Sequence, residues 1–165
     1  MKKIVFLLLC TLVSLTSYAQ FANKISDRKT EADRYDIECA GNGERGTYLV
    51  KVSTYSRNRK IAINQTVKNA VRGVIFKGYG GGDGCVAQRP LTSNPEAEAP
   101  YAEFFEEFFQ NDGAYSRYAS VVDGTLEVTK LTRLWKVSQV VTVRKDDLRK
   151  YLEQKGVIKG LDSMF

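Results

Sequence analysis

The sequence ECAGNGERGTYLV, residues 38–50, places Gly41, Gly43 and Gly46 in the G-x-G-x-x-G spacing that can bind the phosphates of a dinucleotide. That chemistry needs a helix after the glycines, because the free N–H groups at the helix start bind the pyrophosphate. Here the following residues alternate as in a strand, and no acid from 47 to 82 is available to bind a ribose. We predict that these glycines form a β-hairpin connection, with nucleotide binding as the alternative.

A second glycine-rich stretch, GYGGGDGC at residues 78–85, has the composition of a phosphate-binding loop but lacks the G-K-[ST] ending of a P-loop. The candidate residues of this loop are Gly80, Gly81, Gly82 and Asp83. The aspartate could join a calcium site with backbone oxygens, but no second acidic ligand is nearby in sequence. We therefore predict a structural loop, with neither a metal nor a cofactor.

The chain contains no histidine, which excludes Ser-His-Asp and Cys-His nucleophile activation as well as His-ligated zinc. An enzyme with this sequence would need carboxylates, lysine, tyrosine or a metal held by the backbone. Glu106 and Glu107 are adjacent, so on a helix their side chains diverge by about 100°. We interpret them as a solvated face and assign no catalytic residue.

The charges are unevenly distributed along the chain. Residues 47–82 contain no acid, and Arg57, Arg59 and Lys60 fall at the start of a predicted helix. Cations at this position oppose the helix dipole, whereas an anion would be favoured by both. These three residues are therefore a candidate site for phosphate, carboxylate or an anionic glycolipid. The alternative is that the basic segment simply attracts the acidic segment at 90–116 within the fold.

The N-terminus has the pattern of a secretory signal peptide, with the basic MKK, the apolar run IVFLLLCTLVSL and small residues in SYA. We predict a signal peptide at residues 1–19, a flexible lead-in at 20–33 and one domain over 34–165. The alternatives are a retained anchor or a lipoprotein acylated at Cys10, which the large leucine before it disfavours. No later stretch is long and apolar enough to cross a bilayer.

The mature chain would carry 23 basic and 19 acidic residues, a formal charge of +4, and two cysteines, Cys39 and Cys85. Export to an oxidising compartment predicts a disulfide between them, with two free buried thiols as the alternative. Closing the loop between them could stabilise the fold by about 4 kcal/mol. If the strands ending near Cys39 and Lys77 are neighbours, the disulfide joins both glycine-rich loops at one end of the sheet.

The pattern of apolar residues predicts an α+β fold with a single mixed or antiparallel sheet and about three helices packed on it. The order is β-β-α-β-α-β-β-(β)-α. The expected strands span residues 34–39, 47–55, 73–78, 114–122, 125–131 and 133–144. The expected helices span residues 59–73 and 101–109, with a last helix from Asp146 that ends before Gly156. Trp135 and the phenylalanines of 101–109 are expected in the core, with Phe109 as the one that could be exposed.

Several stretches together are similar to a family of small uncharacterised exported proteins of Bacteroides-type bacteria. These are YDIECAGNGERGTYLVKV, VKNAVRGVIFKGYGGGDGC, the Phe-rich helix and VVTVRKDDLRKYLEQKGVIKGL. NQTVKNAVRGVIF and the closing strand and helix also resemble small periplasmic lipoprotein and flagellar-accessory domains. Neither resemblance implies a known catalytic residue.

The sequence favours a non-enzymatic exported protein of the periplasm or outer envelope that acts by binding or as an assembly accessory. Its expected partner is another envelope protein or an anionic envelope component, and not nucleic acid. One alternative is a binding module for anionic glycan or lipid that uses Arg57, Arg59 and Lys60 beside the glycine loops. Another is a carboxylate-dependent cell-wall glycan hydrolase, which needs two acids converging in a cleft.

Overall fold

The computed structural model describes residues 34–82, 84–92 and 98–160, so the predicted signal peptide and lead-in lie outside the described residues. The strands are β1 (Tyr35–Gly41), β2 (Tyr48–Ser56), β3 (Ala119–Val121), β4 (Glu127–Lys130) and β5 (Trp135–Val143). The α-helices are α2 (Arg59–Phe76), α3 (Ala102–Phe108) and α4 (Lys145–Gln154). Two short 3₁₀ helices, η1 (Ala99–Tyr101) and η2 (Ala114–Tyr118), flank α3.

The strands form one five-stranded antiparallel sheet in the order β1-β2-β5-β3, with β4 also paired to β5. Because β2 covers one side of β5 along its whole length, β3 and β4 follow one another on the other side. The link between them continues the ladder, since the N–H of Val140 donates to Thr125 Oγ1 at 3.0 Å. The α+β prediction is confirmed, in its antiparallel form.

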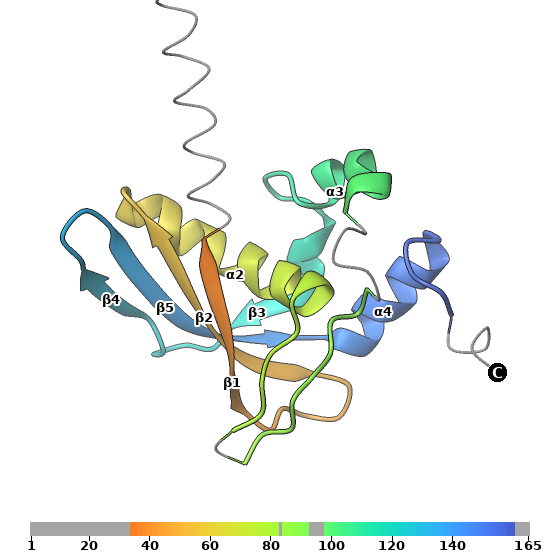
Figure 1. Cartoon of the computed structure of the whole chain (residues 1–165), viewed down its shortest axis with the longest axis horizontal. Helices are drawn as coiled ribbons and strands as arrows, with labels where there is room; N and C mark the ends of the chain where they lie inside the picture. The colour runs from red at the N-terminus through yellow and green to blue at the C-terminus, as the bar shows by residue number, and fades with distance from the viewer. Residues whose placement is uncertain (1–33, 83, 93–97, 161–165) are drawn as a thin grey trace, which may run out of the picture.

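The two faces of the sheet differ because side chains alternate along each strand. One face, which we call the helix face, carries Val50 and Val52 of β2 and Val137 and Val141 of β5, all fully buried. Figure 1 shows α2 running across this face, while α3 and α4 lie toward the end where β5 finishes. The opposite, open face is polar, as in many antiparallel sheets.

Paired polar side chains cover the open face. The hydroxyls of Ser53 and Ser138 lie 2.8 Å apart, and Lys51 Nζ lies 2.9 Å from the carboxylate of Glu127 across β5. These cross-strand pairs connect three neighbouring strands without burying a charge.

The helix α2 begins where the sequence predicts it, because Asn58 caps it by accepting from the N–H of Lys60 at 3.0 Å. In its buried middle, Asn69 Nδ2 donates to Thr54 Oγ1 at 3.0 Å, so the two polar side chains satisfy each other against the sheet. These contacts place α2 firmly on β2.

The predicted strand at 73–78 is wrong, because residues 73–76 form the last turn of α2. Gly73 does not end the helix. It lets the helix approach β1, since a Cβ there would meet Ile37 Cδ1 at 2.6 Å. The helix ends instead at Phe76, and Gly78 after it has a φ of +65° and donates its N–H to the carbonyl of Gly73 at 2.8 Å. One predicted strand is therefore absent from the order.

The strand predicted at 114–122 is also mostly wrong. Its first half is the 3₁₀ helix η2, and only Ala119–Val121 pair with β5. The strand predicted at 125–131 is present as β4, although it is shorter. Trp135 is half-buried rather than core, with Lys130 Nζ 4.4 Å from the centre of its ring.

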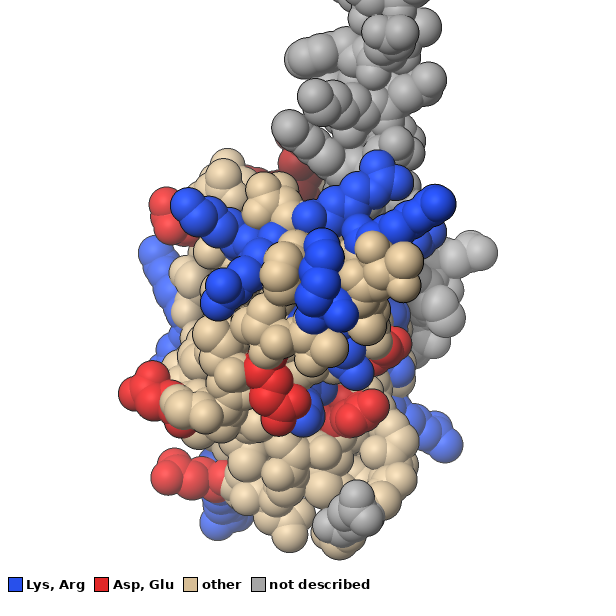
Figure 2. Space-filling model, turned by 90° about the vertical axis from the view of Figure 1, so that its left-hand side faces the viewer, with Lys and Arg blue, Asp and Glu red and all other residues tan. Residues whose placement is uncertain are grey.

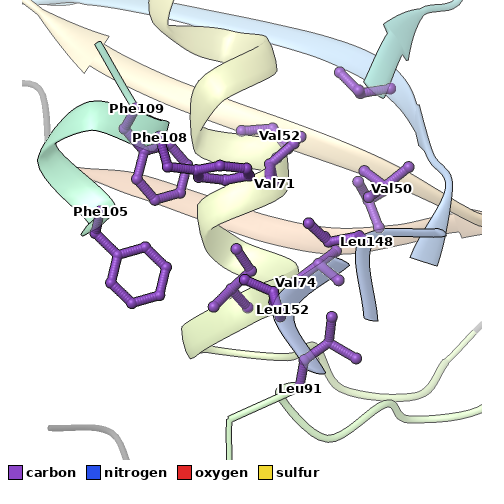
Figure 3. Close-up of a cluster of buried hydrophobic side chains, with 14 of the residues drawn as sticks. Val50, Val52, Val71, Val74, Leu91, Phe105, Phe108, Phe109, Leu148 and Leu152 are labelled. Atoms are coloured by element: carbon purple, nitrogen blue, oxygen red, sulfur yellow. The ribbon is translucent and has the colours of Figure 1, made fainter. Parts of the chain in front are cut away.

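The core lies between the helix face, α2, α3 and α4. Figure 3 shows Phe105, Phe108 and Phe109 of the α3 region on one side of α2, and Leu148 and Leu152 of α4 on another. Phe109 is 3% exposed, so the core prediction is confirmed for this residue and the alternative that it is exposed is not. Across the described ranges, no helix combines the length and the hydropathy needed to span a membrane.

The disulfide Cys39–Cys85 is present and ties β1 to a two-stranded ribbon formed by residues 79–82 and 84–88. The ribbon is closed by the bridge between Tyr79 and Gln88 and by the bridge between Gly82 and Cys85. In Figure 1 this segment extends beside β1, toward the end of the sheet where the β1–β2 connection lies. The disulfide therefore holds the second glycine-rich loop next to the first, although the segment before that loop is the end of α2 and not the neighbouring strand that the prediction assumed.

Candidate anion-binding site

The candidate residues Arg57, Arg59 and Lys60 lie where β2 passes into α2. The strand ends at Ser56, whose hydroxyl accepts from the N–H of Asn58 at 3.1 Å, and this turn directs the chain into the helix. All three cations are exposed. The structure thus brings the three predicted residues to one end of the sheet.

The β4–β5 hairpin adds further cations at the same end. Ser56 lies opposite Trp135 of β5, and Trp135 lies opposite Lys130 of β4. Lys136 lies opposite Tyr55, and Arg133 belongs to the turn that the Leu131 N–H closes on the Leu134 carbonyl at 2.8 Å. On the other side, the carbonyl of Arg34 accepts from the N–H of Tyr55 at 3.1 Å.

We call this surface the basic end. It consists of Arg34, Arg57, Arg59, Lys60, Lys130, Arg133 and Lys136. Figure 2 views the molecule from this side, with lysine and arginine gathered over the upper part and the acidic side chains mostly below. Because three separate segments of the chain contribute, the cluster is a product of the tertiary fold.

Little negative charge offsets this cluster. Residues 47–82 contain no Asp or Glu, and neither do residues 128–145, which form most of the β4–β5 hairpin. Within the described part of the chain, Arg59, Lys60 and Arg133 form no ion pair. Like charges held close together repel each other, so this end is a place where an external anion is favoured.

The start of α2 strengthens this field. Its first turn has no acidic residue, so no side chain of the helix neutralises the positive end of the helix dipole. One N–H of the first turn, that of Lys60, is already bound to Asn58. The helix dipole therefore adds to the attraction that the side-chain charges exert on an anion, but it does not form a binding site by itself.

Tyr55 marks the boundary between the basic end and the open face. Its hydroxyl donates to Asp36 Oδ2 at 2.8 Å, and Lys136 Nζ lies 5.9 Å from the centre of its ring. Burial raises the pKa of Tyr55, and the hydrogen bond to Asp36 raises it further. The hydroxyl therefore stays protonated and remains a hydrogen-bond donor at neutral pH.

Sequence reasoning missed the cations of the β4–β5 hairpin. Lys130, Arg133 and Lys136 are 70 or more positions away from the first cluster in sequence, and only strand pairing brings them together. The absence of acids from 128 to 145 was the signal that could have identified them. It repeats the pattern that singled out residues 47–82.

The glycine-rich loops lie away from this site. Gly41, Gly43 and Gly46 belong to the connection before β2, and a strand follows them, so the hairpin prediction is confirmed. The basic end lies at the opposite end of β2, about 30 Å away for nine residues of strand. The loops and the basic end therefore do not form one site.

In the second loop, Gly80, Gly81 and Gly82 form one arm of the ribbon, and Asp83 lies outside the described residues. Among the residues that are described, no group of three or more His, Cys, Asp or Glu is placed to hold a metal ion.

The alternative of attraction between the basic and acidic segments has some support elsewhere on the surface. Arg72 of α2 binds both carboxylate oxygens of Glu98, at 2.6 and 2.8 Å, and lies 5.5 Å from the centre of the Phe109 ring. This pair attaches the segment before α3 to α2. It lies more than three turns along the helix from Arg59, so it leaves the basic end uncovered.

The acids in and after α3 do not form the converging, buried pair that a carboxylate-dependent hydrolase needs. Glu106 is exposed on α3. Glu107 and Asp112 line a small pocket of about 260 Å³ together with Arg117 and Lys155. Both of these acids are exposed, whereas a general acid that stays protonated at neutral pH needs burial or a close like charge. The arrangement does not favour catalysis by this pair.

Comparison of the chain with models of known protein families, with curated proteins and with solved structures gives no match. The resemblance to exported proteins of Bacteroides-type bacteria stays a prediction.

Proposed function

We propose that this protein is a non-catalytic, exported binding protein whose basic end binds phosphate or carboxylate groups on an anionic envelope component. The observation that carries the proposal is the convergence of cations from β2–α2 and from the β4–β5 hairpin on one end of the sheet, within two stretches, residues 47–82 and 128–145, that contain no acidic residue. Such a surface raises the local concentration of anions and orients them before contact.

Export is supported by the disulfide, because disulfides persist in the periplasm and outside the cell and are rare in the cytosol. A binding role is supported by the absence of histidine from the sequence, which removes the commonest general base near neutral pH. A role as an assembly accessory is compatible with the same surface, since an anionic component can recruit the protein to its place of action.

Anionic groups of this kind belong either to lipid headgroups or to acidic glycans, and the apolar residues at the basic end distinguish the two. Leu131 in the β4–β5 hairpin is 39% exposed, and Ile61 in the first turn of α2 is 38% exposed. Beside cations, exposed apolar side chains can enter the boundary of a bilayer, whereas a soluble glycan gains little from them. We therefore favour a lipid surface within the proposed class.

The test uses residues 20–165 in the oxidised form and compares vesicles of phosphatidylcholine with vesicles that contain phosphatidylglycerol, alongside soluble polygalacturonate. Each cation near an anionic lipid surface contributes about 1 kcal/mol, so the triple variant Arg59→Glu, Lys60→Glu, Arg133→Glu should lose binding at least a hundredfold. Binding should also weaken as salt rises, because exposed charges are screened.

The matched control is the triple variant Lys150→Glu, Lys155→Glu, Lys159→Glu, which makes the same change in net charge on exposed residues in and after α4. If both triple variants lose binding equally, net charge alone explains it and the basic end is not a site. Leu131→Ser should weaken binding to vesicles but not binding to polygalacturonate. An equal loss of binding to both would favour a glycan as the ligand. Absence of binding in both arms would refute the proposed function.

A further inference from the structure

The outer edge of β1 has main-chain groups that no described strand pairs with. The carbonyl of Arg34 accepts from the N–H of Tyr55, so the pairs Asp36–Ser53 and Glu38–Lys51 are the hydrogen-bonded ones. The N–H and C=O groups of Tyr35 and Ile37, which alternate with these residues along β1, must therefore point away from β2. Lys77 confirms this geometry, because its Nζ donates to the outward-facing carbonyl of Tyr35 at 2.9 Å. The N–H and C=O of Ile37 point the same way.

A groove of about 660 Å³ lies along this edge. One wall is β1, from Tyr35 to Glu38, and the other is the segment around Tyr79 and Pro90 that leaves α2 and returns from the ribbon. The disulfide Cys39–Cys85 holds the ribbon to β1 beyond one end of the groove. The volume is within the range of binding pockets and is comparable to a few residues of extended peptide.

The groove has two chemically different sides. Ile37 and Tyr35 lie on the helix face, where they contact Gly73 of α2. Asp36 and Glu38 lie on the open face, and both are exposed. A strand added beside β1 would place alternate side chains on these two faces, because the strand repeat is two residues.

Exposed strand edges are usually blocked by charge, proline or a covering segment, because they otherwise pair with other chains. The groove carries charges of both signs, with Asp36 and Glu38 on β1 and Lys77 and Arg89 on the other wall. A strand added directly beside β1 faces the charges of β1 itself, and these select the partner. In a two-fold pairing of β1 with a second copy centred on Ile37, Asp36 would face Glu38 of the other copy, and like charges directly opposite are unfavourable. A strand with basic side chains at these positions is instead attracted.

We propose that the groove along β1 binds an extended segment of a partner polypeptide that alternates basic and apolar residues, and that this segment adds a strand to the sheet. Its apolar residues lie opposite Ile37, where their main-chain groups bond to the sheet edge, and its basic residues lie opposite Asp36 and Glu38. The groove begins next to Arg34 and so adjoins the basic end, but it uses other residues, and the cations of the basic end repel such a segment. It gives the protein a polypeptide partner in addition to an anionic surface.

The test uses a synthetic peptide of sequence Lys-Val-Lys-Val-Lys-Val with residues 20–165 in the oxidised form, followed by NMR. Bound peptide should slow hydrogen exchange of the Ile37 amide about tenfold or more, because this N–H becomes paired, while amides in the middle of β5 should not change. A peptide with N-methylated valines should not bind, because the N–H groups that face β1 are then missing.

The charge arrangement has its own control. The double variant Asp36→Lys, Glu38→Lys should bind the Lys-Val peptide about tenfold more weakly and should gain binding to a Glu-Val peptide of the same length. The variant Arg59→Glu should bind the Lys-Val peptide at least as well as the parent chain does.

Equal binding of the methylated peptide would show that the contact is only ionic and would overturn the proposal. It would also be overturned if the Ile37 amide stayed unprotected at millimolar peptide. Protection that rises with protein concentration in the free chain would show that a second copy, and not a basic segment, occupies the edge. Because none of these results depends on anionic vesicles, failure here is distinguishable from failure of the proposed function.

Discussion

Removal of the disulfide is the perturbation whose size follows most directly from the structure. The bond joins residues 46 positions apart, so in the unfolded chain it closes a loop of that length. In the chain-entropy treatment, opening such a loop lowers the free energy of unfolding by about 4 kcal/mol at 25 °C. For a domain with a total stability of about 5–15 kcal/mol, this is a large fraction.

Removing the disulfide should cost the native state few contacts, so most of the loss in stability should come from the higher conformational entropy of the unfolded chain. The core contacts of β2, α2, α3 and α4 do not pass through the disulfide. The base of the ribbon is also held to β2 by Tyr48, whose hydroxyl donates to Gln88 at 2.7 Å, whereas the described part of its tip has only the internal bridge between Gly82 and Cys85. The double variant Cys39→Ala, Cys85→Ala should therefore fold, with a ribbon that exchanges its amides faster than before. Its midpoint in urea should fall while the sheet signal by circular dichroism stays the same.

The assay is equilibrium unfolding in urea, followed by the fluorescence of Trp135, the one tryptophan in the chain. The reduced parent chain should unfold at the same midpoint as the double variant, because both open the same loop. Val86→Ala is the matched control, since this side chain at the ribbon is 72% exposed and carries no cross-link. A change of less than about 1 kcal/mol for the double variant, with the ribbon still ordered, would refute the loop-entropy reasoning.

Three further predictions concern packing and titration. Gly73→Ala should stabilise the fold by about 1 kcal/mol through helix propensity but destabilise it by about 1–3 kcal/mol through overpacking against Ile37. In a double-mutant cycle, Ile37→Val should reverse part of this destabilisation. Gly78→Ala should cost about 2 kcal/mol or more in urea unfolding, because φ is +65° and the new Cβ would collide with the carbonyl of Gln88; an unchanged midpoint would contradict the helix end described above. Burial, with a smaller contribution from the neighbouring Tyr48, raises the pKa of Tyr79 to about 12. The unfolded chain therefore releases this proton first, stability should fall as pH rises from about 10 to about 12, and Tyr79→Phe should flatten that part of the curve.

Local signals in the sequence predicted several elements correctly, for reasons that the structure makes clear. The hairpin at Gly41 and Gly46 is encoded by turn glycines between two alternating strands. The last helix is encoded by acids at its start and by Gly156, which has a φ of +70° after its end. In each case the determinants lie within a few residues of the element that they specify.

The secondary-structure predictions were wrong where contacts with residues far away in the sequence determine the local conformation. Gly73 has a poor helix propensity, but it is in α2 because only a residue without a Cβ fits against Ile37 of β1. Residues 114–118 have the composition of a strand, but they wind into η2 beside α3, where Tyr115 packs 5.9 Å from Phe109, measured between ring centres. Propensity is a weak preference, and burial in a specific place overrides it.

The sequence by itself determined the α+β class, the two cysteines that pair, the absence of histidine chemistry and the first three cations of the candidate site. Only the tertiary structure decided that the β4–β5 hairpin completes the basic end, that the glycine loops lie at the far end of β2, and that β1 has an open, acidic edge. The physical reason is that composition and periodicity act over a few residues, whereas a binding surface is assembled by strand pairing between residues far apart in the chain.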